Sequence, residues 1–336
     1  MSAGADDLRD HVVVVVVNFN GLHDTIDCLQ SLAMHCDPRQ FSVVLIDNAS
    51  SAPIDELRAL AFPFELDVRT NAVNEGFAAA CNTGIRVAVA NRSRYVLLLN
   101  NDTVVVDDVI SALKGVLDAD ACLGIVGAVN YYHSLPAEVW CAGVRADFAA
   151  DQFDSVKSFD RTGNKAVRVD WVPGSSLMAR TELLQKIGLL DEKYFVYWEE
   201  VDLCLRARRN GSQVAFVEGT RILHKVGRSS PNALKEYLRT RNKLYFYRKN
   251  LVIAQFFQAS LRVVAKALLR SIYNVLAFRP RLAVAYLVGI VDFLQGRMGG
   301  QRVEFFLKRG SGVAVEDRDR NICRVPAAPR HAVLPR

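Results

Sequence analysis

The first 130 residues alternate between short apolar runs and longer stretches with helical periodicity, and this alternation restricts the fold more than any other feature. Apolar runs of strand length lie at 11–17, 42–47, 66–70, 95–99 and 122–129. Helical patterns between them span roughly 23–34, 76–90 and 107–117. Strands that alternate with helices in this way form an open sheet covered by helices. The sequence therefore predicts an α/β fold with a mostly parallel central sheet.

Short polar segments follow four of these strands, and each contains Asn or Asp. They are Asn18–Gly21, Asp47–Ser50, Asn74–Phe77 and Asn100–Thr103. Ligands of such sheets bind beyond the carboxyl ends of the strands, so four polar ends predict a binding site. The alternative is that each segment only makes a turn, since Asn, Asp and Gly favour turns. The sequence lacks the glycine-rich fingerprints of dinucleotide-binding folds and P-loops, which disfavours both classes.

A second polar group opens a helix that we expect from Tyr197 to a stop at Asn210–Gly211. Glu199, Glu200 and Asp202 lie in its first turns, next to several aromatic residues. Aromatic surroundings desolvate a carboxylate and raise its pKa, which suits a general base. The alternative is that these carboxylates only stabilise the N-terminal end of the helix through its dipole.

The formal net charge of +6 conceals an uneven distribution along the chain. Residues 1–220 carry 19 basic and 30 acidic side chains, whereas residues 221–309 carry 18 basic and 3 acidic ones. In the basic part, Arg262, Lys266 and Arg270 recur every four residues in an amphipathic helical pattern. This stripe predicts binding to an anionic membrane surface. The alternative is a helix packed on the core with a solvated basic face. We expect no nucleic acid partner, because no binding motif accompanies the basic residues.

The cysteines and the N-terminal segment both favour a cytoplasmic protein. The seven cysteines are odd in number and irregularly spaced, which predicts free thiols in a reducing compartment. The segment MSAGADDLRD is acidic and polar, unlike a secretory signal peptide. The longest late apolar stretch, Leu282–Leu294, includes Asp292 and falls short of the ~20 residues that span a bilayer.

Six motifs occur in the order VVVNFNG, LIDNASS, NEGFAAACNTGI, LLLNNDT, GSSLMARTELLQKIGLLDEKYFVYWEEVDLCLRARRNG and HKVGRSS. Together they closely resemble the GT-A family 2 glycosyltransferases, and above all the bacterial rhamnosyltransferase-like subgroup of cell-surface polysaccharide assembly. The resemblance covers roughly residues 10–250. It implies the GT-A fold and an inverting transfer from a nucleotide-diphosphate sugar, with Mg²⁺ or Mn²⁺ as the cofactor.

The resemblance also implies roles for the residues that match the motifs. It assigns nucleotide-sugar binding to Asn18, Asp47, Asn74, Gly76, Asn82, Asn100, Asn101 and Asp102. Residues 100–102 occupy the D-x-D position, where a carboxylate meets the metal and the diphosphate. Because Asn100 replaces the first Asp, Asp102 is the expected metal ligand, with His224 completing the site. The residues from Lys225 to Ser229 favour a phosphate-facing loop.

The catalytic base in this family is the Asp of a Glu-Asp pair, whereas this sequence has Glu199-Glu200 at that position. We expect Glu200 to be the base, with Asp202 ranked behind it and Glu199 as a further alternative. The base takes the proton of an acceptor hydroxyl, which attacks the anomeric carbon from the face opposite the nucleotide. Expected acceptor contacts are Trp171, Gly174, Ser175 and Trp198.

These expectations divide the chain into four parts. They are a polar tail (1–10), the GT-A catalytic domain (11–250), a basic amphipathic helical region that associates with the membrane (251–309) and a second polar tail (310–336). The favoured donor is dTDP-L-rhamnose, with UDP-sugars next. The expected acceptor is lipid-linked or a polysaccharide, at the inner face of the cytoplasmic membrane. Alternatives are a nucleotidyltransferase of related fold and a non-catalytic membrane scaffold with a degenerate site. The linkage and the oligomeric state stay open.

Overall fold

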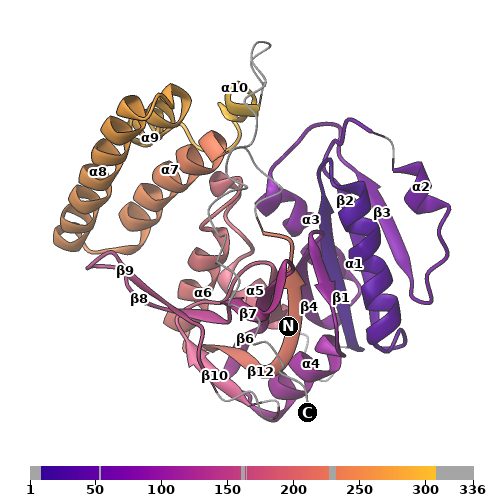
Figure 1. Cartoon of the computed structure of the whole chain (residues 1–336). Helices are drawn as coiled ribbons and strands as arrows, with labels where there is room; N and C mark the ends of the chain where they lie inside the picture. Colours follow the sequence, from indigo (N-terminus) through magenta and orange to yellow (C-terminus); the bar gives the residue numbers. More distant parts are fainter. Residues whose placement is uncertain (1–8, 53, 160–162, 164, 227–231, 308–336) are drawn as a thin grey trace, which may run out of the picture.

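The computed structural model describes residues 9–52, 54–159, 163, 165–226 and 232–307. The second predicted tail, nearly all of the first, and residues 227–229 of the predicted phosphate-facing loop lie outside the described residues. A mixed sheet forms the centre of the molecule, with the strand order β10-β12-β6-β11-β4-β1-β2-β3. Figure 1 shows this sheet among the helices, with the C-terminal helices at one end of the molecule.

One half of the sheet is parallel. It contains β1 (Arg9–Asn18), β2 (Phe41–Asp47), β3 (Leu66–Thr70) and β4 (Ser93–Asn100). Helices α1 (Leu22–His35) and α4 (Val109–Ala119) cover one face of β1, and α3 (Phe77–Ala90) covers the other. All six valines at 12–17 are buried between these layers. A strand buried on both faces has no solvent-facing side, so polar residues do not alternate with apolar ones along it. This explains the unbroken run of valine.

The other half of the sheet is mixed. Its strands are β5 (Thr103–Val105), β6 (Leu123–Tyr132), β7 (Leu135–Cys141), β10 (Ala166–Val169), β11 (Ser176–Arg180) and β12 (Gln213–His224). Strands β6 and β12 are parallel, and β11 is inserted antiparallel between β4 and β6. A separate hairpin joins β8 (Gly143–Asp147) to β9 (Gln152–Val156). The predicted α/β class is confirmed, but β11 was missed, because its apolar run is only Leu177–Ala179, directly before a helix, and has no periodicity of its own.

The predicted helices are present, with three short additions. Helix α5 spans Thr181–Ile187, and the predicted helix α6 (Glu199–Arg209) ends before Gly211, whose φ of 87° suits glycine. The later helices are α7 (Asn232–Asn250), α8 (Ile253–Leu276) and α9 (Pro280–Leu294). The additions are α2 (Asp55–Arg58), the 3₁₀ turn η2 (Glu192–Tyr194) and α10 (Val303–Leu307).

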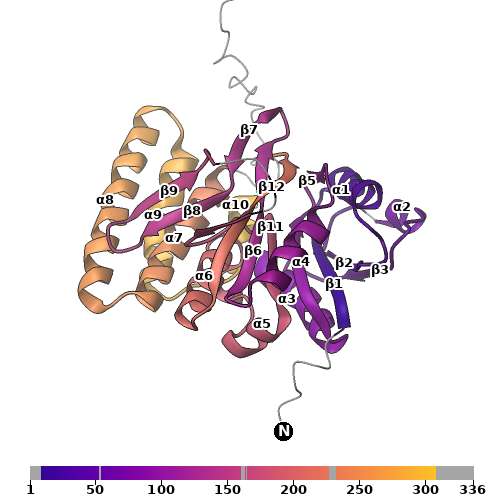
Figure 2. The ribbon, with the colours of Figure 1, turned by 90° about the horizontal axis from the view of Figure 1, so that it is seen from below.

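Helices α8 and α9 lie beyond α7, away from the parallel half of the sheet (Figures 1 and 2). The predicted cationic stripe of α8 does not form a free outer face, because all three residues contact the protein. Arg262 donates to the Ala149 carbonyl at 2.9 Å, Lys266 pairs with Asp151 at 2.8 Å, and Arg270 lies 3.9 Å from Glu236. The carboxylate of Asp151 is fully buried, and a buried charge requires a partner. Each residue of the stripe therefore has a partner within the protein, although the side chains of Lys266 and Arg270 remain 59% and 64% exposed.

Two helical glycines of this fold differ in the space around them, and we expect opposite effects from replacing them. Gly84→Ala on α3 should lower the free energy of unfolding by about 1–3 kcal/mol, because the added Cβ would lie 2.4 Å from Val15 Cγ1. Gly115→Ala on α4 should raise it by about 1 kcal/mol, because no atom lies within 4 Å of that Cβ. Urea unfolding of both variants measures the effects. Stabilisation by Gly84→Ala would contradict the packing of α3 on β1.

Candidate active site

A cavity of about 530 Å³ lies at the carboxyl ends of β1 and β4, beside the start of α6. Its walls also include the 173–175 turn, the 195–197 turn and parts of α7 and α10. The structure brings most of the predicted site residues to this cavity. They are Asn74, Gly76, Asn100, Asn101, Asp102, Trp171, Gly174, Ser175, Glu199, Glu200 and His224.

Several buried polar atoms on the cavity wall have no hydrogen-bond partner among the described residues. They are Asn100 Oδ1, Asp102 Oδ2, Trp171 Nε1, Glu199 Oε2, Glu200 Oε2 and His224 Nδ1. Leaving one buried polar group unsatisfied costs about 1–3 kcal/mol, so native proteins seldom do so. A concentration of such atoms on one cavity therefore marks it as the place where a polar ligand binds.

Asp102 and His224 meet in this cavity from distant parts of the chain. Asp102 follows β4, His224 ends β12, and Oδ1 of the carboxylate lies 3.1 Å from Nε2 of the imidazole. In the part of the chain that the structure describes, no three His, Cys, Asp or Glu side chains are arranged to hold a metal ion. Two such ligands still fit Mg²⁺ or Mn²⁺, because these ions commonly take substrate phosphates and water as their other ligands. The second carboxylate oxygen of Asp102, which lacks a hydrogen-bond donor, is suitably placed for a cation.

Asn18 and Asp47, both predicted to bind the nucleotide, are buried next to the cavity rather than on its wall. Asn18 Nδ2 donates to Asp47 Oδ1 at 2.8 Å, and Ser50 Oγ donates to the same oxygen at 2.6 Å. These bonds join the ends of β1 and β2. Their sequence neighbours Phe19 and Asn48 line the cavity instead. Asn18 and Asp47 therefore hold the strand ends that carry Phe19 and Asn48, and their contact with a nucleotide stays a prediction.

Asn82 and Lys225 also lie outside the cavity wall. The Asn82 side chain bonds the backbone N–H and C=O of Leu190 at 3.0 and 2.9 Å, which ties the segment before α6 to α3. Lys225 Nζ pairs with Asp24 and Asp27 of α1 at 2.7 and 2.6 Å. Its charge is thus already balanced, so Lys225 does not face a phosphate as the sequence predicted.

The turn before α6 has a backbone conformation that bulky residues rarely adopt. Phe195, Tyr197 and Trp198 have φ values of 68°, 72° and 80°. Each such residue costs of order 1–3 kcal/mol, and the surrounding structure must hold it. The Asn242 amide of α7 supplies part of this support by donating to three carbonyls of the turn. They belong to Tyr194, Val196 and Tyr197, at 2.8, 2.9 and 2.8 Å.

Two predicted residues next to this turn have different outcomes. Gly76 lines the cavity, and a Cβ there would lie 2.5 Å from the Phe195 ring, so only glycine allows the turn to approach. Its φ of 90° also favours glycine. Trp198 does not line the cavity and packs against Phe153 and Phe246. We therefore do not assign Trp198 to the acceptor.

The turn ends at two adjacent carboxylates on the cavity wall, Glu199 and Glu200. Burial raises the pKa of Glu199, and the charge of Glu200 raises it further. Burial also raises the pKa of Glu200, but backbone N–H groups at the start of α6 and the charge of Arg239 oppose this rise. Glu200 therefore ionises more readily than Glu199, which is the order expected if Glu200 is the general base.

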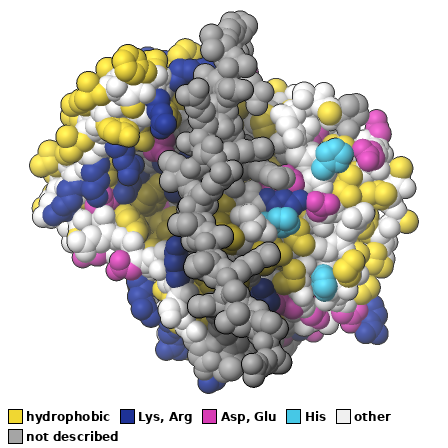
Figure 3. All heavy atoms as spheres, viewed as in Figure 1, with side chains coloured by type: hydrophobic (Ala, Val, Ile, Leu, Met, Phe, Trp, Pro, Cys, Tyr) yellow, Lys and Arg dark blue, Asp and Glu magenta, His cyan; other side chains and the backbone are white. Residues whose placement is uncertain are grey.

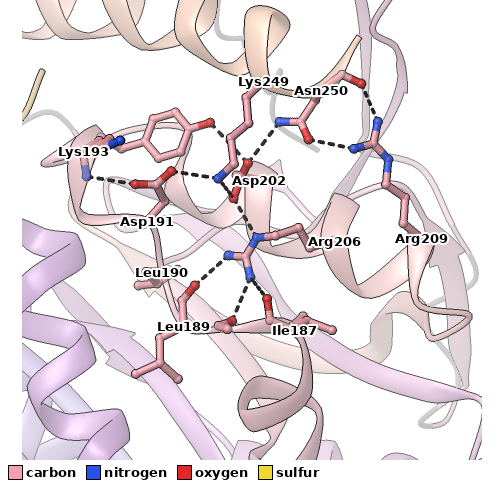
Figure 4. Close-up of polar contacts among 12 residues, drawn as sticks. Ile187, Leu189, Leu190, Asp191, Lys193, Asp202, Arg206, Arg209, Lys249 and Asn250 are labelled. Carbon is pink, nitrogen blue, oxygen red and sulfur yellow. Dashed lines mark hydrogen bonds and ion pairs between the residues drawn. The ribbon is translucent and has the colours of Figure 1, made fainter. Parts of the chain in front are cut away.

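The third predicted carboxylate, Asp202, does not line the cavity and belongs to a buried polar network (Figure 4). Its Oδ2 accepts from Arg206 Nε at 2.8 Å and from Lys249 Nζ at 3.0 Å, and its Oδ1 accepts from Asn250 Nδ2 at 3.0 Å. The side chain has 0% exposure. Because an acceptor hydroxyl cannot reach these enclosed oxygens, we assign Asp202 a structural role rather than that of the base.

The cavity also has a wall that the sequence did not predict. Leu234, Lys235 and Arg239 come from α7, while Val303 and Leu307 come from α10. These residues lie in helices that read in sequence only as basic and apolar segments. The one available signal was Lys235 in the first turn of a helix, where the dipole disfavours a cation.

Known proteins resemble this chain over most of its length. The family model described as "Glycosyltransferase like family 2" matches residues 9–274. The dTDP-rhamnosyl transferase RfbF of Shigella flexneri is 20% identical over 313 residues, which cover 88% of this chain and 99% of the relative. The N-acetylglucosaminyl-diphospho-decaprenol L-rhamnosyltransferase of Mycobacterium tuberculosis is 32% identical over 75 residues, which cover 22% of this chain and 24% of the relative.

A solved structure shares the fold. The mannosyltransferase PcManGT from Pyrobaculum calidifontis, solved in complex with GDP-Man and Mn²⁺, superposes with a TM-score of 0.54 and 14% identity. The alignment covers 87% of this chain and 90% of that one. This likeness confirms the expected GT-A fold.

The raised pKa of Glu199 predicts a stability that depends on pH. Below its ordinary value of 4.5, both folded and unfolded states hold the proton. As pH rises above that value, the unfolded state ionises first, so the wild-type protein loses stability relative to a residue that does not titrate. Glu199→Gln should therefore unfold at nearly the wild-type temperature at pH 4 and at a higher temperature at pH 8.

Thermal unfolding across that pH range measures this difference. The matched control is Glu138→Gln on the exposed edge strand β7, which should leave the melting temperature unchanged at both values. A Glu199→Gln variant less stable than wild type at pH 8 would show that an ionised Glu199 is needed for folding.

Proposed function

Because this chain belongs to glycosyltransferase family 2, we propose that it moves a sugar, with inversion, from a nucleotide-diphosphate donor to an acceptor hydroxyl. The observation that carries the proposal is the cavity that joins the Asp102–His224 pair to the Glu199–Glu200 pair. The first pair suits a cation and a diphosphate, and the second suits proton removal. Both pairs also argue against a non-catalytic scaffold, and the family match argues against a nucleotidyltransferase.

Glu200 acts as the general base in this proposal. It takes the proton of the acceptor hydroxyl as the oxygen attacks the anomeric carbon. Glu199 stays protonated beside it, so that a second negative charge does not repel the developing alkoxide. Asp102 and His224 would hold the divalent cation, which when bound offsets charge on the departing diphosphate. Asn100 and Asn101 lie between these groups in the cavity wall and are suited to donate hydrogen bonds to the donor.

The donor proposed first is dTDP-L-rhamnose, because two relatives of this chain are named as rhamnosyltransferases. UDP-sugars come next. The acceptor proposed is lipid-linked, as the name of the Mycobacterium tuberculosis relative specifies for that protein. We place the reaction at the cytoplasmic face of the membrane, in keeping with the free thiols of the six described cysteines.

Membrane contact is proposed through apolar side chains, rather than through the cationic stripe that the sequence predicted. Figure 3 shows hydrophobic side chains gathered over α8 and α9, with Lys and Arg beside them. The exposed apolar residues include Ile253, Phe257, Leu261, Leu269, Ile272, Leu276, Val291 and Leu294. In the described ranges, every helix falls short of the length and apolarity needed to cross a bilayer. The proposed contact is therefore peripheral, with apolar side chains entering one leaflet.

Glu200→Gln should lower sugar transfer by at least 100-fold, because loss of a general base typically costs 10²–10⁴-fold in rate. Nucleotide binding should stay nearly unchanged. Transfer is measured from a panel of dTDP- and UDP-sugars into a total membrane lipid extract with Mn²⁺, and binding is measured as a thermal shift. Asp102→Asn is the matched variant, and it should abolish the Mn²⁺-dependent thermal shift. Wild-type turnover by Glu200→Gln would rule out its role as the base.

Replacing two exposed leucines of α8 should weaken membrane binding of the full chain. Leu261→Gln with Leu269→Gln removes two side chains that are 70% and 68% exposed. Each buried leucine contributes about 1.5–3 kcal/mol, so partitioning onto phosphatidylglycerol vesicles should fall by more than 10-fold in a flotation assay. Met34→Gln on α1, 76% exposed, is the control and should float as wild type does. Equal flotation of all three proteins would exclude this face as the membrane contact.

A further inference from the structure

We propose that Lys235 and Arg239 of α7 bind the diphosphate group of an amphiphilic acceptor, and that Leu234, Val303 and Leu307 receive the first part of its apolar chain. The inference rests on the proposed function, because it treats this end of the cavity as the acceptor end. Its substrate class is a sugar joined to a lipid through a diphosphate. The argument depends on the charge, burial and neighbours of these five residues.

The two cations share one face of α7 and the same cavity. Lys235 and Arg239 are four residues apart, a spacing that makes helix residues neighbours and makes like charges repel. Burial lowers the pKa of Lys235, and the charge of Arg239 lowers it further. The adjacent Glu236 opposes this fall only in part, and the first turn of α7 contains no acidic residue. Placing a cation near the positive end of the helix dipole adds to this cost.

No carboxylate of the described residues forms an ion pair with either cation. The adjacent Glu236 lies 3.9 Å from Arg270 of α8 instead. Arg239 carbon Cζ lies 6.0 Å from the centre of the Tyr197 ring, which leaves its N–H groups available. Two neighbouring cations that form no direct ion pair suit a ligand with more than one negative oxygen, and Arg and Lys are the usual partners of phosphate.

The surroundings of these cations are apolar, which separates a lipid diphosphate from a free anion. Leu234 and Val303 are 3% and 4% exposed, and they belong to a cluster that also includes Phe195 and the partly buried Leu307. An apolar chain can contact the carbons of this cluster that line the cavity, whereas a free phosphate cannot. Helix α7 packs against α9, whose outer face carries exposed apolar residues. A lipid chain that leaves the cavity along α10 therefore meets the side of the molecule proposed to contact the membrane.

The position also fits the chemistry of transfer. The charge of Arg239 lowers the pKa of Glu200, so the two groups are close enough to interact electrostatically. In a sugar-diphosphate-lipid, the sugar is bonded directly to the diphosphate. Binding the diphosphate at Lys235 and Arg239 therefore brings the sugar hydroxyls beside the proposed base.

Farnesyl diphosphate is a suitable probe because it has the charge and the apolar chain but no nucleotide. Binding to the full chain is measured by titration calorimetry in EDTA, which removes the metal that the nucleotide site needs. Wild-type protein should bind farnesyl diphosphate at least 10-fold more tightly than farnesol or inorganic pyrophosphate. Lys235→Gln with Arg239→Gln should weaken that binding at least 10-fold without lowering the melting temperature. Lys186→Gln with Lys193→Gln, both outside the cavity, is the matched control and should bind as wild type does.

Asp102→Asn separates this inference from the proposed function. The variant should bind farnesyl diphosphate as wild type does, even though it loses Mn²⁺-dependent nucleotide binding. Displacement of farnesyl diphosphate by dTDP would assign the cations to the donor nucleotide and overturn the inference. Equal binding by wild type and the Lys235–Arg239 double variant would overturn it as well. Failure of every dTDP- and UDP-sugar to bind wild type would instead count against the proposed function alone.

Discussion

The fully buried carboxylate of Asp202 is the interaction on which the active site depends. Arg206 bonds Asp202 and also the carbonyls of Ile187, Gly188 and Leu189, while Lys249 joins Asp202 to Asp191 (Figure 4). A buried charge that loses a partner costs about 3–5 kcal/mol, so these groups stay together. One carboxylate thus fixes the start of α6 against the preceding segment and against the end of α7.

This network makes the C-terminal helices part of the catalytic machinery. The turn that carries Glu199 and Glu200 is strained at three aromatic residues, and Asn242 of α7 holds its carbonyls. Helix α7 is in turn packed against α9 and bonded to it through Tyr237 and Asp292. The proposed base and the turn before it are therefore held in place by a helical layer that lies more than 30 residues further along the chain.

Local pattern predicted the parallel half of this protein well, and distant partners limited the rest. The apolar runs predicted β1 to β4, and the polar strand ends predicted much of the cavity wall. Both signals depend on residues that are neighbours in sequence. Asp202 looked like Glu200 in sequence, since both are acidic residues in the first turns of one helix. Asp202 is distinguished by the partners that enclose it, and two of these, Lys249 and Asn250, lie far along the chain. The partners of the α8 stripe were missed for the same reason, because the sequence does not show that Asp151 is buried opposite Lys266.

The hydrogen bonds from Asn242 to the turn at 194–198 also bear on which segments can be exchanged between related enzymes. A chimera that takes residues 188–202 from a relative but keeps its own α7 would pair a strained turn with the wrong supporting amide. The turn and α7 therefore have to come from the same protein, even though β12 lies between them in the chain. Natural recombination or design that exchanges this turn has to move both segments together.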